Sequence, residues 1–205
     1  GAGGGSLAWT DPGGALRVGP QRAGAQPGPA AYGRGGTEPA VTDAQLVLGR
    51  FDAAAPLGDI PKLDLEAARR AVADRVAGPL GMSLEDAAAG VLTVAEANME
   101  QAIRLISVER GHDPRRFALL AFGGAGPLHG ARLAERMGIP TVIVPTSAGV
   151  LSAFGLLTAD LSHHFVRTVL GAGETDWDAL NAALNAFRQQ GAARLADDGV
   201  PPERQ

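Results

Sequence analysis

One short stretch, FALLAFGGAGPLHG at residues 117–130, limits most strongly what this chain can fold into. Its apolar run ends in Gly123 and Gly124, and a helical pattern begins at Pro127. A second apolar run, residues 141–144, follows that helix directly. Two nearly continuous apolar strands joined by a helix are typical of a parallel sheet that helices cover on both faces. The stretch therefore predicts an α/β fold.

The turn inside this stretch is a candidate nucleotide loop, because a sharp strand-to-helix turn aims backbone amides and the positive end of a helix at an anion. A Walker A loop needs a lysine at the start of the helix, but the only lysine, Lys62, lies far upstream. The dinucleotide fingerprint G-x-G-x-x-G fits Gly124 and Gly126, but His129 takes the third place, and the second strand ends VPT without an acidic residue. A tight turn without any ligand remains an alternative.

The loop resembles the adenosine-side loop of the actin-like ATPase superfamily, in which an apolar strand ends in paired glycines and a proline opens the next helix. Glycine lets the backbone pass against a nucleotide where any Cβ would collide, and proline costs nothing in the first helical turn. Three glycines are more than a turn requires. The predicted nucleotide contacts are Gly123, Gly124, Ala125, Gly126, Pro127 and His129.

The composition changes along the chain and predicts three stretches. Residues 1–61 are rich in Gly and Pro and predict short strands and loops. Residues 62–172 carry the strands, helices and glycine loop of the predicted ATPase lobe, and residues 173–205 predict an amphipathic helix. The predicted helices cover residues 64–76, 84–109, 127–137, a segment after Ser147, and 175–197, and the predicted strands cover 117–122, 141–144 and HHFVRTVL at 163–170. Asp64 and Ser83 are the predicted caps of the first two helices, and Gly78-Pro79 and Gly138 are the predicted stops of the first and third. The apolar stripe at residues 84–106 predicts a helix face that is buried in the core.

Charge and composition exclude several functions. The net charge of −4 gives no electrostatic case for a nucleic acid or an anionic membrane as partner. No apolar run approaches the roughly 20 residues that span a bilayer, and the absence of cysteine excludes disulfides and thiolate metal sites. The adjacent His163 and His164 would point to opposite faces of a strand, so we expect no metal site from them. A cytoplasmic location is the expectation.

Four segments together resemble the hydantoinase A/5-oxoprolinase family: GAGGGSLAW at residues 1–9, residues 19–50 with YGRGG and TDAQLVLGR, residues 97–130, and residues 142–161. The resemblance implies an actin-like fold, of which this chain is most of the second lobe, and ATP-dependent hydrolysis of a cyclic amide. It further implies ATP and Mg²⁺ as cofactors, a hydantoinase B-like partner subunit or domain, and phosphorylation of the amide oxygen before water attacks.

Two other functions remain open. Acetone and acetophenone carboxylase subunits are relatives of the family, so a carboxylation is an alternative to hydrolysis. A non-catalytic actin-like module that binds nucleotide as a switch is the alternative from another class.

The chain departs from the family pattern in two ways. The family commonly has a cysteine before the tyrosine of YGRGG, and Ala31 stands in that place. The family's D-x-G-G-T phosphate motif is expected upstream of residue 1, and its carboxy-terminal domain beyond the last helix. We therefore expect an internal piece of a longer protein that does not turn over ATP by itself.

Asp43 and Arg34 are the candidate catalytic residues. Asp43, in VTDA, suits the orientation of a substrate or water, and a helix cap is the alternative. Arg34 stands between glycines and carries the planar fork that clamps a carboxylate or phosphate, with a surface salt bridge as the alternative. Gly3 to Gly5 are further candidates for phosphate contact, or a simple turn.

Overall fold

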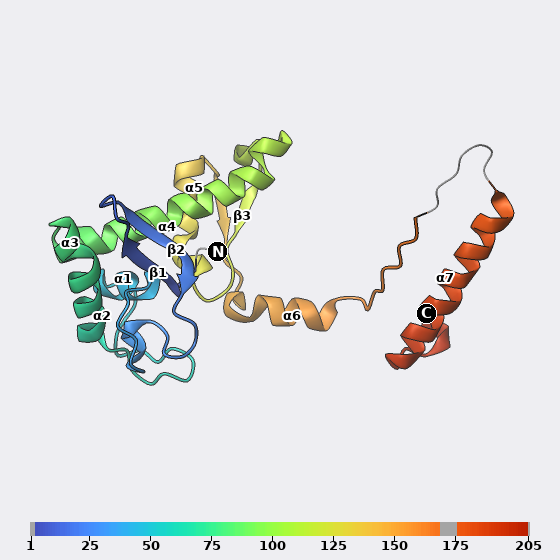
Figure 1. Cartoon of the computed structure of the whole chain (residues 1–205), viewed down its shortest axis with the longest axis horizontal. Helices are drawn as coiled ribbons and strands as arrows, with labels where there is room; N and C mark the ends of the chain where they lie inside the picture. The colour runs from blue at the N-terminus through green and yellow to red at the C-terminus, as the bar shows by residue number, and fades with distance from the viewer. Residues whose placement is uncertain (1–2, 169–175, 205) are drawn as a thin grey trace. The chain divides into compact units, whose positions relative to one another are not determined.

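The computed structural model describes residues 3–168 and 176–204. The chain divides into two compact units, Gly1–Ser152 and Ala153–Gln205. Figure 1 shows the helices and strands along the chain. In order they are β1 (Ser6–Thr10), β2 (Leu16–Arg22), α1 (Val41–Val47), α2 (Leu65–Val72), a π turn (Ala73–Ala77), α3 (Gly78–Leu80), α4 (Leu84–Ile106), β3 (Ala118–Leu120), α5 (Gly126–Met137), β4 (Thr141–Ile143), α6 (Leu151–Thr158) and α7 (Trp177–Asp197), with short 3-10 turns at Ala30–Tyr32, Val108–Arg110, Pro114–Arg116, Ala148–Val150 and Pro202–Arg204.

The amino-terminal part of the first unit is a hairpin packed on helices. β1 and β2 are antiparallel, with Ala8 opposite Val18, and both side chains are buried. They share an apolar core with Val41 and Ala44 of α1 and with residues of α2 and α4. The prediction of short strands and loops in this region is confirmed, with α1 as an additional helix.

The helix that begins at α2 is longer than predicted. Asp64 caps it as expected, because its Oδ1 accepts the Ala67 amide at 2.8 Å. The prediction that Gly78-Pro79 ends the helix is wrong. The Gly78 amide donates to the carbonyl of Ala73, five residues back, and this wider turn accommodates Pro79, which has no amide hydrogen.

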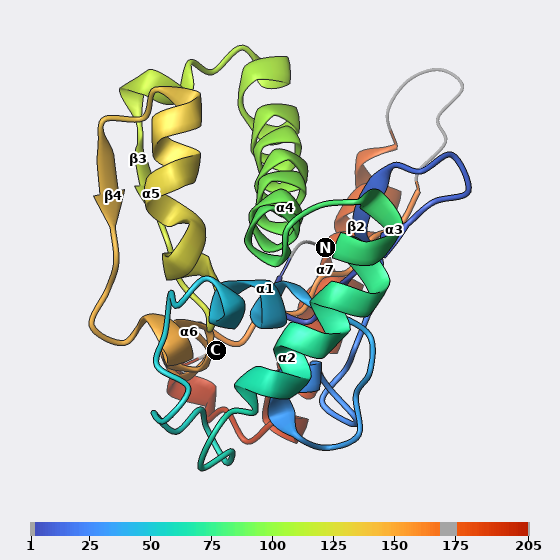
Figure 2. The same ribbon diagram turned by 90° about the vertical axis from the view of Figure 1, so that its left-hand side faces the viewer.

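The long helix α4 is the centre of the first unit. The predicted cap at Ser83 is confirmed, because Ser83 Oγ accepts the Asp86 amide at 3.1 Å. Helix α4 lies between α2 on one side and α5 on the other (Figure 2). Its predicted apolar stripe is fully buried at Val91 and Ala95, but Ile106 is 61% exposed. The expectation of core along the whole stripe is therefore wrong for its last turns.

The predicted strands around the glycine loop form a small parallel sheet. β3 and β4 pair with Leu119 opposite Val142, which confirms the parallel arrangement, although both strands are shorter than predicted. Helix α5 covers one face, where Leu119 and Val142 are half-buried (Figure 2). Leu120 and Ile143 on the opposite face are about half exposed, at 47% and 48%. Within residues 3–168 and 176–204, the predicted helical cover is therefore present on one face of this sheet only.

A glycine brings α5 close to this sheet. A Cβ at Gly130 would lie 3.1 Å from Ala121 Cβ and 3.2 Å from Val142 Cγ1, so a side chain there would push the helix from the strands. The helix ends at Gly138, whose φ of +67° is the left-handed stop that the sequence predicted.

The second unit contains α7, which Asp176 caps by accepting the Ala179 amide at 3.0 Å. The strand predicted at 163–170 is absent over residues 163–168, and 169–170 lie outside the described residues. Phe165 of this segment instead stacks on Phe187 of α7, with ring centroids 6.1 Å apart. The divisions predicted at residues 61 and 172 stay predictions.

Candidate functional site

The glycine loop lies on a cavity of about 560 Å³, the glycine-loop cavity. The other walls come from residues 4–5, Tyr32, helix α1, the segment 51–57 and Leu63. Most of the lining is apolar, and no lysine or arginine is among its described residues. Segments that are more than one hundred residues apart in the sequence therefore line the same cavity.

Gly123 and Gly124 of the loop differ in whether the fold requires a glycine. Gly123 has φ +82°, a conformation that other residues rarely adopt, and its amide donates to the Ala148 carbonyl at 2.8 Å. Gly124 has no such φ, and a Cβ added there would meet no atom within 4 Å. Neither the backbone conformation nor the packing of the described chain therefore requires glycine at position 124. Its open backbone faces the cavity that it lines.

A second glycine segment faces this loop. A Cβ at Gly4 would lie 2.8 Å from Thr42 Oγ1 and 3.6 Å from Ala125 Cβ. The Gly4 carbonyl accepts both the amide and the hydroxyl of Thr42, at 2.8 and 2.9 Å. Gly4 is therefore fixed by close packing against α1, and it brings this segment to within reach of the loop.

A chain of buried polar side chains lies beneath the cavity. His129, Gln45 and Glu96 are each at most 1% exposed. Gln45 Nε2 lies 3.3 Å from His129 Nε2, and His129 Nδ1 lies 3.5 Å from Glu96 Oε1. Two arginines close the chain, Arg132 at 3.1 Å from Glu96 Oε2 and Arg50 at 3.9 Å from Glu96 Oε1.

The surroundings of His129 favour its neutral form. Burial lowers the pKa of His129, and the hydrogen bond and charge of Glu96 oppose that shift. The two arginines balance the buried Glu96 carboxylate. His129 was predicted from the sequence, but Gln45 and Glu96 were not. Glu96 follows Leu92 by four residues, and that spacing on a helix whose apolar face is buried was the available signal.

The predicted catalytic Asp43 lies in α1 but is not among the residues that line the cavity. Its carboxylate accepts the backbone amides of Ala31 at 2.7 Å, Ala40 at 2.7 Å and Ala30 at 3.3 Å. Burial raises the pKa of Asp43, and these hydrogen bonds oppose the shift. The carboxylate thereby joins the start of α1 to the turn that presents Tyr32 to the cavity. A catalytic role for Asp43 stays a prediction.

The predicted catalytic Arg34 also lies outside the cavity lining. Its Nη2 donates to Asp59 Oδ2 at 2.7 Å, and the Asp59 side chain is 80% exposed. The Arg34 guanidinium lowers the pKa of Asp59. The structure therefore brings together Gly124, Ala125, Pro127 and His129, leaves Gly123 and Gly126 at their side, and does not bring Arg34 to them.

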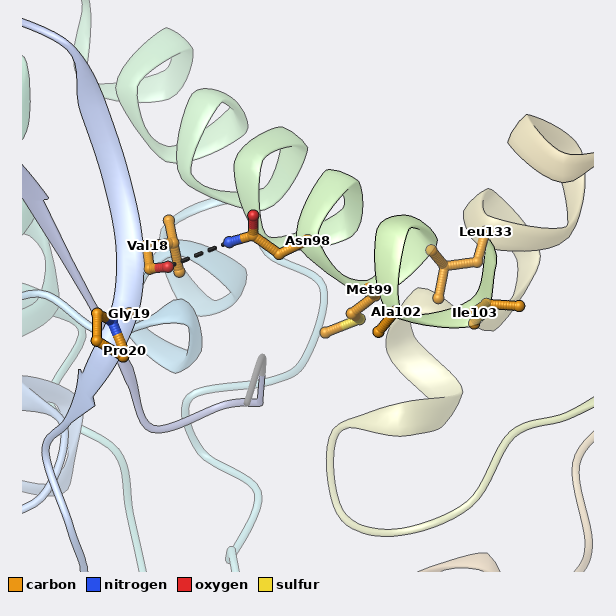
Figure 3. A pocket seen from close by; sticks show the side chains of 8 residues that line it. All are labelled: Val18, Gly19, Pro20, Asn98, Met99, Ala102, Ile103 and Leu133. Atoms are coloured by element: carbon orange, nitrogen blue, oxygen red, sulfur yellow. Dashed lines mark hydrogen bonds between the residues drawn. The ribbon is translucent and has the colours of Figure 1, made fainter. Parts of the chain in front are cut away.

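A second cavity, of about 620 Å³, lies between β2, α4 and α5 and is here called the hairpin cavity (Figure 3). Asn98 supplies its polar side chain, and Asn98 Nδ2 donates to the Val18 carbonyl at 3.1 Å. The other lining residues shown in Figure 3 are Gly19, Pro20, Met99, Ala102, Ile103 and Leu133. No titratable group lines this cavity among the described residues.

Within residues 3–168 and 176–204, no three histidine, aspartate or glutamate side chains come together where they could hold a metal ion. No helix in the described parts of the chain is both long and apolar enough to cross a bilayer.

Two solved structures resemble this one over nearly the whole chain. The ATP-dependent caprolactamase from Pseudomonas jessenii has a TM-score of 0.72 and 44% sequence identity, and the match covers 97% of this chain and 29% of that one. The nucleotide-free acetone carboxylase, from a study of ATP-dependent acetone carboxylation, has a TM-score of 0.79 and 30% identity, and the match covers 99% and 30%. The predicted α/β, ATPase-type fold is confirmed.

The sequence matches a family described as hydantoinase/oxoprolinase over residues 1–165. The chain belongs to this family, as its motifs predicted. The caprolactamase subunit alpha of Pseudomonas jessenii is 46% identical over 202 residues, which are 97% of this chain and 29% of that protein. The acetophenone carboxylase gamma subunit of Aromatoleum aromaticum is 42% identical over 209 residues, 98% and 28% respectively. The chain thus spans less than a third of the length of these relatives.

Proposed function

We propose that this chain is part of an ATP-dependent hydrolase that opens cyclic amides. The proposal rests on Gly124, which lines a mostly apolar cavity. Neither the conformation nor the packing of the described chain requires a glycine at this position. The caprolactamase subunit alpha, at 46% identity, supports the choice of a cyclic amide as substrate.

We propose that ATP binds in this cavity, in contact with the backbone of the glycine loop. The open face at Gly124 and the neighbouring residues Ala125 and Pro127 would hold the nucleoside side of ATP, with Gly4 and Gly5 also lining the cavity. ATP supplies phosphorylation of the amide oxygen, which converts a resonance-stabilised carbonyl into one that water attacks. The cavity offers no lysine or arginine among its described residues. We therefore propose that Mg²⁺ and groups outside this chain neutralise the phosphates, and that this chain alone does not turn over ATP.

The residues of this chain around the glycine-loop cavity bind and orient the ligand and do not take part in bond making or breaking. His129 and Glu96 hold Gln45 at the cavity, and Asp43 holds the turn that carries Tyr32. Tyr32 and the apolar lining would exclude water from the nucleoside that we propose to bind in the cavity. The hydrogen bonds of Asp43 favour a positioning role for it, and Arg34 remains a candidate only if its pair with Asp59 opens.

The relatives support a proposal for the partner. Those relatives are named as subunits, so multi-subunit assembly is expected of the family, and we propose a hydantoinase B-like subunit or domain as the partner. We place the enzyme in the cytoplasm, where ATP is supplied.

The competing function is carboxylation, which the 42% identity to an acetophenone carboxylase subunit favours. The test incubates the full-length protein and its partner with ATP and Mg²⁺, either with hydantoin, 5-oxoproline or caprolactam, or with a ketone and bicarbonate. ATP consumption coupled to ring opening supports the proposal. Consumption coupled only to bicarbonate fixation supports the carboxylase, and nucleotide binding without any turnover overturns both.

A further inference from the structure

We propose that Gln45 accepts a hydrogen bond from an N–H group of a neutral ring bound in the glycine-loop cavity. The inference rests on the proposed function and deepens it, because it assigns a specificity-determining residue to that site. Two sources carry the chemistry that Gln45 would read, namely the amide N–H of the cyclic substrate and the amino group of adenine.

The orientation of the Gln45 amide follows from its neighbours. The Glu96 carboxylate can only accept a hydrogen bond, so the proton of a neutral His129 lies on Nδ1, 3.5 Å from Glu96 Oε1. His129 Nε2 is then an acceptor, and the Gln45 group that faces it at 3.3 Å must be the NH₂. The carbonyl oxygen of Gln45 is therefore turned away from His129.

Within the described parts of the chain, that carbonyl oxygen has no hydrogen-bond partner. Gln45 Oε1 is buried and lacks a partner among the described residues, while Gln45 itself is 1% exposed and lines the cavity. Buried side-chain acceptors are normally paired, because leaving one unpaired costs its desolvation free energy. An orphaned acceptor at the edge of a cavity, held in one orientation by a buried chain of hydrogen bonds, is what a donor group on a ligand would satisfy.

The cavity lining selects the kind of ligand. Its walls include Phe51, Leu57, Leu63 and Leu128, and the described lining contains no lysine or arginine. Asp52, the acidic lining residue, already accepts the Ala54 amide at 2.9 Å. Phosphate or carboxylate groups would meet no positive charge here, whereas a flat or puckered neutral ring would meet apolar walls. The donor that reaches Gln45 therefore belongs to a neutral ring.

Two ligand pairs that differ only in the donor test the inference on the full-length protein. Caprolactam is compared with caprolactone, which replaces the ring N–H by oxygen, and ATP is compared with purine riboside triphosphate, which lacks the amino group. Calorimetry gives the dissociation constants for the wild type, for Gln45→Met, and for the control Thr42→Val. Thr42 lies on the same helix and lines the same cavity, but its hydroxyl is already bonded to Gly4.

We expect the wild type to bind the N–H member of one pair about tenfold or more tightly than its analogue. Gln45→Met should abolish that preference, and Thr42→Val should keep it. The pair that shows the loss identifies the source of the donor.

Equal affinities within both pairs in the wild type overturn the inference, even if Gln45→Met does not fold. A preference that survives in a folded Gln45→Met protein also overturns it, as does the absence of binding by every ligand. A protein that shows the Gln45-dependent preference but opens no cyclic amide supports the inference and overturns the proposed hydrolase instead.

Discussion

The glycine-loop cavity and the hairpin cavity have similar volumes, about 560 and 620 Å³, but they use their polar groups differently. In the hairpin cavity the amide nitrogen of Asn98 is bonded to the Val18 carbonyl. In the glycine-loop cavity, a buried chain of polar side chains ends in an acceptor with no partner in the described structure. Volume alone therefore does not mark a ligand site. The unsatisfied hydrogen-bonding capacity of the wall distinguishes the two.

The largest difference is expected in stability, from two glutamates one turn apart on α4. Glu96→Gln removes a fully buried charge that balances Arg50 and Arg132, whereas Glu100→Gln removes a charge paired with Arg104 and Arg136 near the surface. A lost buried pair costs about 3–5 kcal/mol, and because Arg132 is 54% exposed we expect about 2–3 kcal/mol for Glu96→Gln. Glu100→Gln should cost at most about 1 kcal/mol.

Denaturant unfolding of the full-length protein measures both values. Equal losses in the two variants would mean that the buried chain beneath the glycine-loop cavity is no more important to stability than an ordinary surface ion pair.

A smaller effect is expected on affinity when a branched side chain is added to each cavity. Gly124→Val places Cβ where the backbone faces the glycine-loop cavity, and Ala102→Val adds the same branching to the wall of the hairpin cavity. We expect Gly124→Val to weaken ATP binding about tenfold or more, or about 1.4 kcal/mol, with little change in melting temperature. Ala102→Val should leave ATP binding unchanged.

Calorimetric ATP titration beside a melting curve separates the two cases. A Gly124→Val protein that melts earlier but binds ATP as tightly as the wild type would show that the glycine serves the turn and not the ligand.

The smallest expected effect is a pH dependence of the unfolding free energy that comes from His129. The pKa of His129 lies below its ordinary 6.5 because of burial, so the unfolded chain takes up this proton before the folded one does. The contribution of His129 to stability is therefore complete above pH 6.5 and is lost as the pH falls below that value. Glu96 from α4, Arg50 after α1 and Arg132 from α5 are the charged groups that face this chain.

His129→Gln should flatten the fall of unfolding free energy that occurs as the pH decreases below 6.5. The exposed His112 provides the matched control, and His112→Gln should leave the slope as in the wild type. An unchanged slope in His129→Gln would contradict the assignment of the lowered pKa to this imidazole.

The sequence was most informative where the signal is local. The caps at Asp64 and Ser83, the stop at Gly138 and the strand–loop–helix order around Gly123 all depend on residues within a few positions of each other. The family motifs extended this to the family and the fold class.

The candidate site was only partly predictable, because its polar chain joins distant segments. Gln45 and His129 are 84 positions apart, and Glu96 and His129 are 33 apart, so no local pattern reports their contact. The strand predicted at HHFVRTVL failed for a related reason. β-branched and aromatic residues favour a strand, but a strand also needs a neighbour to pair with, and Phe165 instead stacks on the ring of Phe187.

The uncovered face of the β3–β4 sheet bears on how this chain can be handled. Among the described residues, Leu120 and Ile143 face outward from a two-stranded sheet, and a sheet of this kind has two open edges. Apolar ribbons with open edges pair with copies of themselves as concentration rises. Purification of these 205 residues alone should therefore yield concentration-dependent self-association. A lysine at Ile143 is the economical way to keep the preparation monodisperse without touching the glycine loop.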